Sequence, residues 1–202
     1  MNNLSEILKK IKFQNNEYKT DKNTTHSYIN EFYENKFKFY KNKEIVLAEI
    51  GILGSESLCM WAEYFPRSKI FGIDHYAPKS DMYKKYKNIE ILTCNAYQIS
   101  TTEKLPFLDI VIDDGSHKLQ DQKKFIEIYM PKMKINSLMI IEDIQKVDYI
   151  DDLFCECKKQ EIINNLDKKK IIIPKFYDLI KNKNRYDDLL FEISIKKNIK
   201  CL

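Results

Sequence analysis

Residues 113–117 read Asp-Asp-Gly-Ser-His, so two carboxylates, a glycine and an imidazole follow one another directly. Further along the chain, Glu142 and Asp143 add two more acids. Mg²⁺ prefers several oxygen ligands and keeps water or substrate oxygens in its remaining positions, so Asp114, Glu142 and Asp143 can supply one face of a Mg²⁺ site. Mn²⁺ suits the same ligands. His117 would lie beside the metal as a general base, taking the proton of a substrate hydroxyl whose pKa the metal lowers.

The same residues also have a purely structural interpretation. Asp114 or Ser116 can cap a helix that begins near residue 118, and Glu142 and Asp143 can cap a helix in the same way. In that case His117 is an ordinary surface residue. The spacing of the side chains leaves both interpretations open.

A second group of residues suggests a ligand pocket. Residues 51–57 read Gly-Ile-Leu-Gly-Ser-Glu-Ser, and glycines at such a turn let the backbone approach a ligand near free N–H groups of a helix. Asp74 follows Gly51 by 23 residues, close to the spacing of an acid that binds ribose hydroxyls. The turn departs from the dinucleotide and phosphate-loop fingerprints. A nucleotide, S-adenosylmethionine, or a plain tight turn with a cap all fit this pair.

Short apolar runs predict the strands that must position these acids. Five of these runs lie at residues 45–50, 69–74, 89–93, 108–114 and 138–143. Each is followed by a helical pattern or by another strand. Helices are predicted after the first run, where Pro66 ends the pattern, and over 118–130 and 149–165. Strands that alternate with helices form a parallel, doubly wound sheet whose ligands lie beyond the carboxyl ends of the strands. The acids at those ends should therefore meet.

The two ends of the chain complete the predicted fold. Helices are expected over 4–13 and 27–40, with a polar loop over 15–26 between them. Strands at 171–177 and 189–195 are joined by a short polar segment, which predicts an antiparallel hairpin. The fold class is therefore α/β, a Rossmann-like sheet of seven strands that resembles the architecture of class I methyltransferases. The 202 residues are expected to form a single domain, with an N-terminal helical cap at 1–43 and the core at 44–202.

Composition excludes several classes of protein. With 44% hydrophobic and 32% charged residues and no long apolar run, neither a membrane-inserted nor a disordered chain is expected, and the polar start predicts a cytoplasmic location. The net charge of +4 comes almost entirely from scattered lysines, which disfavours a nucleic-acid partner. The five cysteines contain no Cys-x-x-Cys pair, so no disulfide framework or zinc site is indicated. A homo-oligomer is compatible with the sequence.

Several short blocks occur in an order that resembles a known family. They are Thr20-Asp21-Lys22 with His26 and Tyr28, Glu49-Ile50-Gly51, Ser57-Leu58-Cys59-Met60-Trp61, Tyr64-Phe65-Pro66, Gly72-Ile73-Asp74, Ile112 to His117, and Ile141-Glu142-Asp143. The set resembles the metal-dependent sugar O-methyltransferases typified by the macrocin and mycinamicin enzymes. The resemblance covers roughly residues 20–146, and the Asp-Gly-Ser-His element with the downstream Glu-Asp is its most specific part.

The resemblance implies S-adenosylmethionine as cosubstrate and Mg²⁺ as cofactor. The acceptor would be a sugar hydroxyl of a glycan, nucleotide-sugar or glycosylated metabolite, and the partner a small molecule or glycan. The family usually has a Gly-Asp-like turn after the third strand, where this chain has Asn95. The residues implied are Glu49, Gly51, Ser57, Asp74, Asn95 and Asp114 for the cosubstrate, Asp114, Glu142 and Asp143 for the metal, and His117 as the base.

Other functions stay open at this point. A catechol-like acceptor would use similar metal-chelating acids, whereas an RNA ribose methyltransferase should show a catalytic lysine at a strand end, which is not seen. A nucleotide-dependent oxidoreductase fits the glycine turn poorly. A non-catalytic domain that binds S-adenosylmethionine or a glycan would be expected to lack some of the acids. The segment around residues 20–28 is expected either to fold over the cosubstrate or to form a plain surface loop.

Overall fold

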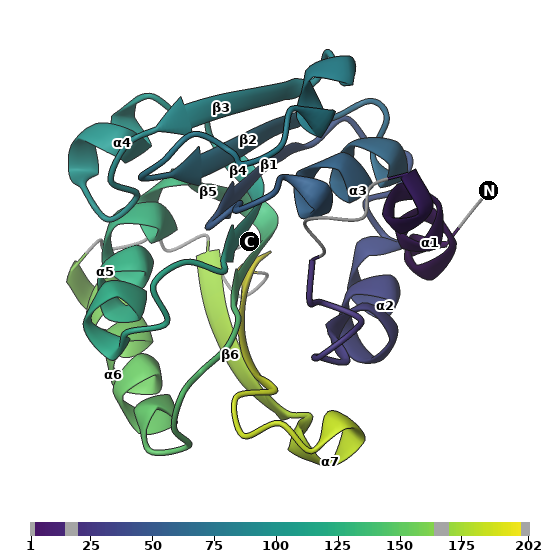
Figure 1. The fold of residues 1–202 in the computed structure, drawn as a ribbon. Helices are drawn as coiled ribbons and strands as arrows, with labels where there is room; N and C mark the ends of the chain where they lie inside the picture. Colours follow the sequence, from purple (N-terminus) through teal and green to yellow (C-terminus); the bar gives the residue numbers. More distant parts are fainter. Residues whose placement is uncertain (1–2, 15–19, 164–169, 199–202) are drawn as a thin grey trace.

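The computed structural model describes residues 3–14, 20–163 and 170–198 and contains a mixed seven-stranded sheet (Figure 1). Its strands are β1 (Val46–Ile50), β2 (Lys69–Asp74), β3 (Ile89–Thr93), β4 (Leu108–Asp113), β5 (Met133–Ile141), β6 (Lys170–Asp178) and β7 (Leu189–Lys197). The strand order is β3-β2-β1-β4-β5-β7-β6. β1 to β5 pair in parallel, and β7 is antiparallel to both β5 and β6. The predicted parallel sheet and C-terminal hairpin are thus confirmed.

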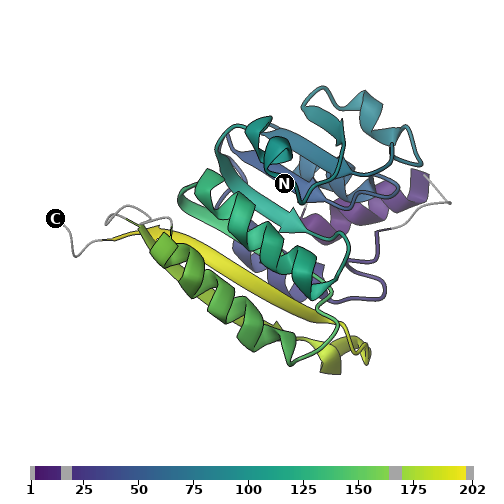
Figure 2. The ribbon, with the colours of Figure 1, turned by 90° about the vertical axis from the view of Figure 1, so that its left-hand side faces the viewer.

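Helices cover both faces of the sheet (Figures 1 and 2). They are α1 (Leu4–Gln14), the π-helical turn η1 (Ile29–Tyr33), α2 (Glu34–Phe37), α3 (Glu56–Tyr64), η2 (Met82–Lys85), α4 (Ile99–Glu103), α5 (Leu119–Tyr129), η3 (Met130–Lys132), α6 (Tyr149–Ile163) and α7 (Ile180–Lys183). α1, α2 and α3 pack on one face, and α5 and α6 on the other. None of the described helices is long and apolar enough to cross a membrane.

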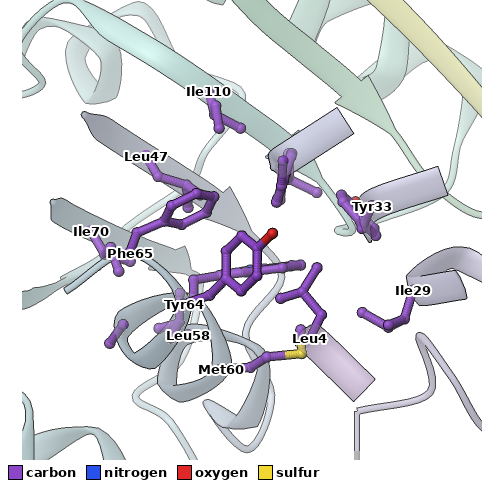
Figure 3. Packing of buried hydrophobic residues seen from close by; sticks show 14 of the residues in the cluster. Leu4, Ile29, Tyr33, Leu47, Leu58, Met60, Tyr64, Phe65, Ile70 and Ile110 are labelled. Carbon is purple, nitrogen blue, oxygen red and sulfur yellow. The ribbon is translucent and has the colours of Figure 1, made fainter. Parts of the chain in front are cut away.

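Consecutive residues of the central strands face opposite layers of the core. Leu47 of β1 and Ile110 of β4 belong to the cluster under α3, whereas Ala48 and Val111 belong to the cluster under α5 and α6. Figure 3 shows Leu47 and Ile110 among the aromatic and aliphatic side chains of the first cluster. Side chains alternate across a strand, so a strand covered on both faces is apolar at nearly every position. This explains the continuous apolar runs in the sequence.

Two elements differ from their predicted extents. β5 begins at Met133 rather than at residue 138, because its pairing with β4 shifts: Leu108 pairs with Met133, but Ile110 pairs with Leu138. Asn136, inside this irregular stretch, has a left-handed φ of +63°. The predicted helix over 27–40 is present over residues 28–37, where the π-helical turn η1 continues directly into α2, and it ends at Phe37 rather than at residue 40. Residues 15–19 of the predicted loop and 164–165 of the last predicted helix lie outside the described residues.

Gly51 ends β1 in a conformation that other residues adopt only at a cost. Its φ is +79°, and its N–H donates to the carbonyl of Ile73 at 2.9 Å. A Cβ placed there would lie 2.0 Å from the carbonyl oxygen of Asp114 and 2.8 Å from Cα of Gly115. Both obstacles are backbone atoms that the sheet holds in place. The turns after β1 and β4 can therefore approach each other only because residue 51 is glycine.

We expect Gly51→Ala to lower the free energy of unfolding by more than about 1–2 kcal/mol, the cost of the left-handed conformation alone. The backbone clash with Asp114 adds to this cost. Urea unfolding monitored by circular dichroism measures the difference. The matched control is Leu53→Ala in the same turn, where the side chain is 58% exposed and little change is expected. Equal midpoints for Gly51→Ala and the wild type would contradict the close approach.

Candidate active site

The carboxyl ends of β1, β4 and β5 lie at the same level, and this brings the predicted acids together. Ile50 pairs with Asp113, and Asp113 pairs with Ile141. The ladder continues beyond the strands, since the N–H of Asp114 donates to Ile50 at 3.0 Å and the N–H of Glu142 donates to Asp113 at 2.9 Å. The acids that follow β4 and β5 therefore lie at one edge of the sheet, as the parallel order predicted.

Two adjoining cavities open at this edge. The first, of about 400 Å³, is lined by Thr20, Asp21, Gly51, Ile52, Leu53, Gly54, Glu56, Ser57, Asp74, Asp114, Gly115, His117 and Asp143. The second, of about 410 Å³, shares Gly51, Asp74 and Gly115 with the first and adds Asn95, among others. Of the residues predicted for the site, Glu49 and Glu142 line neither of these two cavities.

Asp74 lies where the two cavities meet, and backbone amides hold its carboxylate in place. The N–H of Ile52 donates to Oδ2 at 3.0 Å, and the N–H of Tyr76 donates to Oδ1 at 3.3 Å. Asn95 is similarly fixed, since its Oδ1 accepts from the N–H of Tyr97 at 2.9 Å. Carboxylate oxygens keep further lone pairs for a ligand, so Asp74 can accept hydroxyl hydrogen bonds without leaving the turn.

Behind the first cavity, the side chain of Lys22 is completely buried among three acids. Its Nζ lies 2.7 Å from Asp114 Oδ2, 2.5 Å from Glu142 Oε2 and 3.3 Å from Glu49 Oε1. Burial lowers the pKa of the ammonium, but the charges of Asp114, Glu142 and Glu49 outweigh it and raise this pKa well above its usual value. The three neighbouring carboxylates therefore favour the charged form of Lys22.

Tyrosine hydroxyls engage the acids that follow β5. Tyr33 donates to the Glu142 oxygen that Lys22 does not contact, and Tyr28 donates to Asp143 Oδ1 at 2.6 Å. The ring of His26 is buried as well, with Nδ1 at 3.5 Å from Asp143 Oδ1. Glu142 thus has both oxygens bound within the protein, whereas Asp143 has Oδ2 turned toward His117.

Asp114, His117 and Asp143 offer ligand atoms that all lie within 4.8 Å of one another. His117 Nε2 is 3.9 Å from Asp143 Oδ2, and His117 Nδ1 is a buried nitrogen without a hydrogen-bond partner among the described residues. Burial, with the nearby charge of Asp114, raises the pKa of Asp143 to about 8. Mutually repelling oxygen donors beside an unpartnered imidazole fit a divalent cation.

Backbone geometry distinguishes the two residues that flank this candidate metal position. His117 has a φ of +56° and Asp143 a φ of +55°, both in the left-handed region. His117 lies directly after the turn of β4, and Asp143 two residues after the end of β5. The two side chains reach the first cavity from these positions.

The helix-capping interpretation of Asp114 does not describe the structure. α5 has Lys118 as its N-cap residue, without a side-chain cap, and Asp114 contacts Lys22 instead. The turn before α5 is held by Tyr97, which donates to Asp113 Oδ1 at 2.8 Å and accepts from the N–H of Ser116 at 3.1 Å. Burial raises the pKa of Asp113 to about 7. Asp113 is therefore an internal support of the turn.

Residues 20–28 form part of the site rather than a detached loop. Thr20 and Asp21 line the first cavity, and Lys22, His26 and Tyr28 contact its acids from behind. The sequence left open whether this segment covers the cosubstrate or forms a surface loop, and it assigned no individual contact to Lys22, His26 or Tyr28. Asp21, His26 and Asp143 also form a second group with ligand atoms within 4.8 Å of one another. Tyr33 and Tyr97 carried no sequence signal, because a lone tyrosine is typical of any core.

Comparison with known proteins places these features in context. No protein-family model matches the chain. It is 32% identical over 126 residues to the 8-demethyl-8-(2-methoxy-alpha-L-rhamnosyl)-tetracenomycin-C 3'-O-methyltransferase of Streptomyces olivaceus, and 30% identical over 121 residues to the mycinamicin VI 2''-O-methyltransferase of Micromonospora griseorubida. Each match covers 55% of this chain but only 31% and 30% of those relatives. The chain thus corresponds to about a third of their length.

Solved structures show the same fold. MycE, a methyltransferase of the mycinamycin pathway solved with Mg and SAH, superposes with a TM-score of 0.67 at 18% identity, over 98% of this chain and 56% of that one. Fibrillarin of Aeropyrum pernix, solved with bound S-adenosyl-L-methionine, has a TM-score of 0.57 at 11% identity, over 75% of this chain and 67% of that one. The chain has the class I methyltransferase fold and is similar in sequence to sugar O-methyltransferases.

Proposed function

We propose that the chain is an S-adenosylmethionine-dependent O-methyltransferase that uses Mg²⁺ or Mn²⁺ and acts on a sugar hydroxyl in the cytoplasm. One observation carries the proposal: Asp114, His117 and Asp143 converge in the cavity that Gly51, Ser57 and Asp74 also line. A metal position and a cosubstrate pocket thus share one space. The names of the relatives support the sugar acceptor, and the MycE structures, one of which also holds mycinamycin VI, support the two cofactors.

In this proposal the cosubstrate lies along the two adjoining cavities. Gly51 has no side chain to block the junction of the two cavities, so a ligand can approach its backbone. Asp74 accepts hydrogen bonds from the ribose hydroxyls. Asn95 lines the second cavity. Ser57 and Asp114 line the first cavity, which also contains the candidate metal position. Glu49 supports the pocket from behind: its Oε2 accepts from Trp61 Nε1 at 3.0 Å, and its Oε1 faces Lys22.

A bound divalent cation would lower the pKa of the acceptor hydroxyl. Asp114 and Asp143 would hold it, together with the predicted third ligand Glu142. A carboxylate oxygen has two lone pairs, so Glu142 can keep its contact with Lys22 while it contributes to the metal. His117 would accept the hydroxyl proton at Nε2, the nitrogen that faces Asp143. The acceptor oxygen would then bond to the methyl carbon of S-adenosylmethionine while the bond from that carbon to sulfur breaks, which would release S-adenosylhomocysteine.

An open groove of about 620 Å³ next to His117 can receive the acceptor. It is lined by Ser116, His117, Lys118, Leu119, Gln120, Gln145 and Tyr149. Two side-chain amides, a hydroxyl and a tyrosine provide donors and acceptors for a ligand rich in hydroxyl groups. This composition favours a sugar over an apolar acceptor, and the groove meets the first cavity at His117.

We expect the wild-type chain to bind S-adenosylhomocysteine, and Asp74→Ala to weaken this binding by about 10–100-fold, because hydrogen bonds to a charged acceptor contribute about 1.5–3 kcal/mol. Isothermal titration calorimetry measures both affinities. Asp81→Ala is the matched control, since the Asp81 side chain is 75% exposed and pairs with Lys84. No binding of S-adenosylmethionine or S-adenosylhomocysteine by the wild type would contradict the proposed function. Equal affinity in Asp74→Ala would contradict only the ribose contact.

His117→Ala is expected to lower kcat by about 10²–10⁴-fold, the usual contribution of a positioned base. Release of S-adenosylhomocysteine, with mycinamycin VI and simple rhamnosides as acceptors, measures turnover. Mn²⁺ affinity of the same variant separates two roles of the imidazole. Unchanged affinity with slow turnover supports the base, whereas loss of Mn²⁺ binding would make His117 a metal ligand. Turnover within a factor of two of wild type would rule out both roles.

A further inference from the structure

Lys22 is a completely buried lysine that the proposed chemistry does not use. We propose that Lys22 is a positioning residue: its ammonium group holds Asp114, Glu142 and Glu49 in their places, in the metal-loaded enzyme as well as without the metal. The proposal rests on the proposed function, because Asp114 and Glu142 are two of its three metal-binding acids. It assigns a role to the segment that precedes the sheet.

The contacts of Lys22 reach three separate elements. Asp114 follows β4, Glu142 follows β5, and Glu49 lies within β1, and the ammonium contacts one oxygen of each. Trp61 Nε1 donates to the other oxygen of Glu49. The hydroxyl of Tyr33 donates to the other oxygen of Glu142. Asp114 differs, since its side chain is 18% exposed and lines the first cavity. Lys22 therefore fixes Asp114 by Oδ2 while the carboxylate stays open to a ligand.

An internal cation stabilises the charged form of the acids at this place. Several kcal/mol are needed to bury each unpaired carboxylate, and like charges that are buried together repel strongly. Glu49 and Glu142 are 0% and 1% exposed at their side chains, so water cannot stabilise them. A divalent cation held on the cavity side by Asp114, Asp143 and Glu142 would leave Glu49 with its hydrogen bond from Trp61 but with no positive charge beside it. Lys22 is thus needed in both states.

The backbone around Lys22 is anchored on both sides, as a positioning role demands. The N–H of Thr20 donates to Glu56 Oε2 at 2.5 Å, and the N–H of Ile29 donates to the carbonyl of Lys22 at 3.1 Å. Ser27 Oγ donates to Asp188 Oδ2 at 3.0 Å. Hydrogen bonds therefore hold the backbone from which the Lys22 side chain reaches its three acids. This position of the ammonium does not depend on a metal.

The test compares Lys22→Met with the wild type in the full chain. Methionine keeps much of the length of the side chain and removes its charge. Outer partners of metal ligands usually change metal affinity by about 10–100-fold, so we expect Lys22→Met to bind Mn²⁺ that much more weakly. Electron paramagnetic resonance of free Mn²⁺ measures the affinity. The measurement is made at a temperature below the unfolding midpoint of each variant. Calorimetry with S-adenosylhomocysteine reports in parallel whether the neighbouring pocket is intact.

Lys36→Met is the matched control. Lys36 Nζ lies 2.6 Å from Glu192 Oε2, with Glu192 buried on β7, so this variant also removes a lysine from a buried glutamate. Neither residue lines the two cavities of the site. Both variants should unfold at lower temperature, but only Lys22→Met should lose Mn²⁺ affinity.

A double variant covers the case in which Lys22→Met does not fold. Lys22→Met with Glu49→Gln removes one negative charge together with the cation, so it should unfold at a higher temperature than Lys22→Met alone, while Asp114 still lacks its partner and Mn²⁺ binding stays weak. Wild-type Mn²⁺ affinity in the folded variant would overturn the positioning role. Tighter Mn²⁺ binding would also overturn it, because Lys22 would then compete with the metal. A wild-type chain that binds neither Mn²⁺ nor S-adenosylhomocysteine would contradict the proposed function and this inference with it.

Discussion

Repulsion between buried carboxylates is the constraint on which the arrangement of this protein depends. A parallel sheet brings the carboxyl ends of its strands to one edge, and in this chain the ends of β1, β4 and β5 all carry acids. Glu49, Glu142 and Asp143 are almost completely buried. Cations and hydrogen-bond donors around such a group stabilise its charged form, because each unpaired ion would cost several kcal/mol. Most contacts at this edge serve that requirement.

The N-terminal segment supplies most of these compensating groups. Lys22 brings the positive charge, and Tyr28 and Tyr33 bring hydroxyl donors. The π-helical turn η1 and α2 hold this segment against α3, with Tyr33 and Phe37 packed on Trp61. Trp61 in turn donates to Glu49. The aromatic core under α3 and the polar edge of the sheet are thus one continuous structure.

Local patterns predicted the sheet and the acids at its edge. The apolar runs located each parallel strand, and the position of Asp114 and His117 directly after β4 followed from them. The contacts of Lys22 could not be predicted in the same way, because its partners Asp114 and Glu142 lie 92 and 120 residues away in the chain. The early start of β5 depends on a register shift against β4, and η1 is π-helical although its buried residues Ile29, Phe32 and Tyr33 have the spacing of an ordinary helix. Both are set by tertiary packing.

The left-handed backbone of His117 and Asp143 has a consequence for the evolution of this chain. Side chains other than glycine adopt that conformation at a cost of roughly 1–2 kcal/mol. Glycine would relieve the strain at either position, yet it would remove the imidazole or the carboxylate that faces the cavity. Under the proposed function, thermal stability therefore favours glycine at these two positions, whereas the base and the metal ligand require His117 and Asp143. Stabilised variants of this chain that keep both side chains must gain their stability elsewhere.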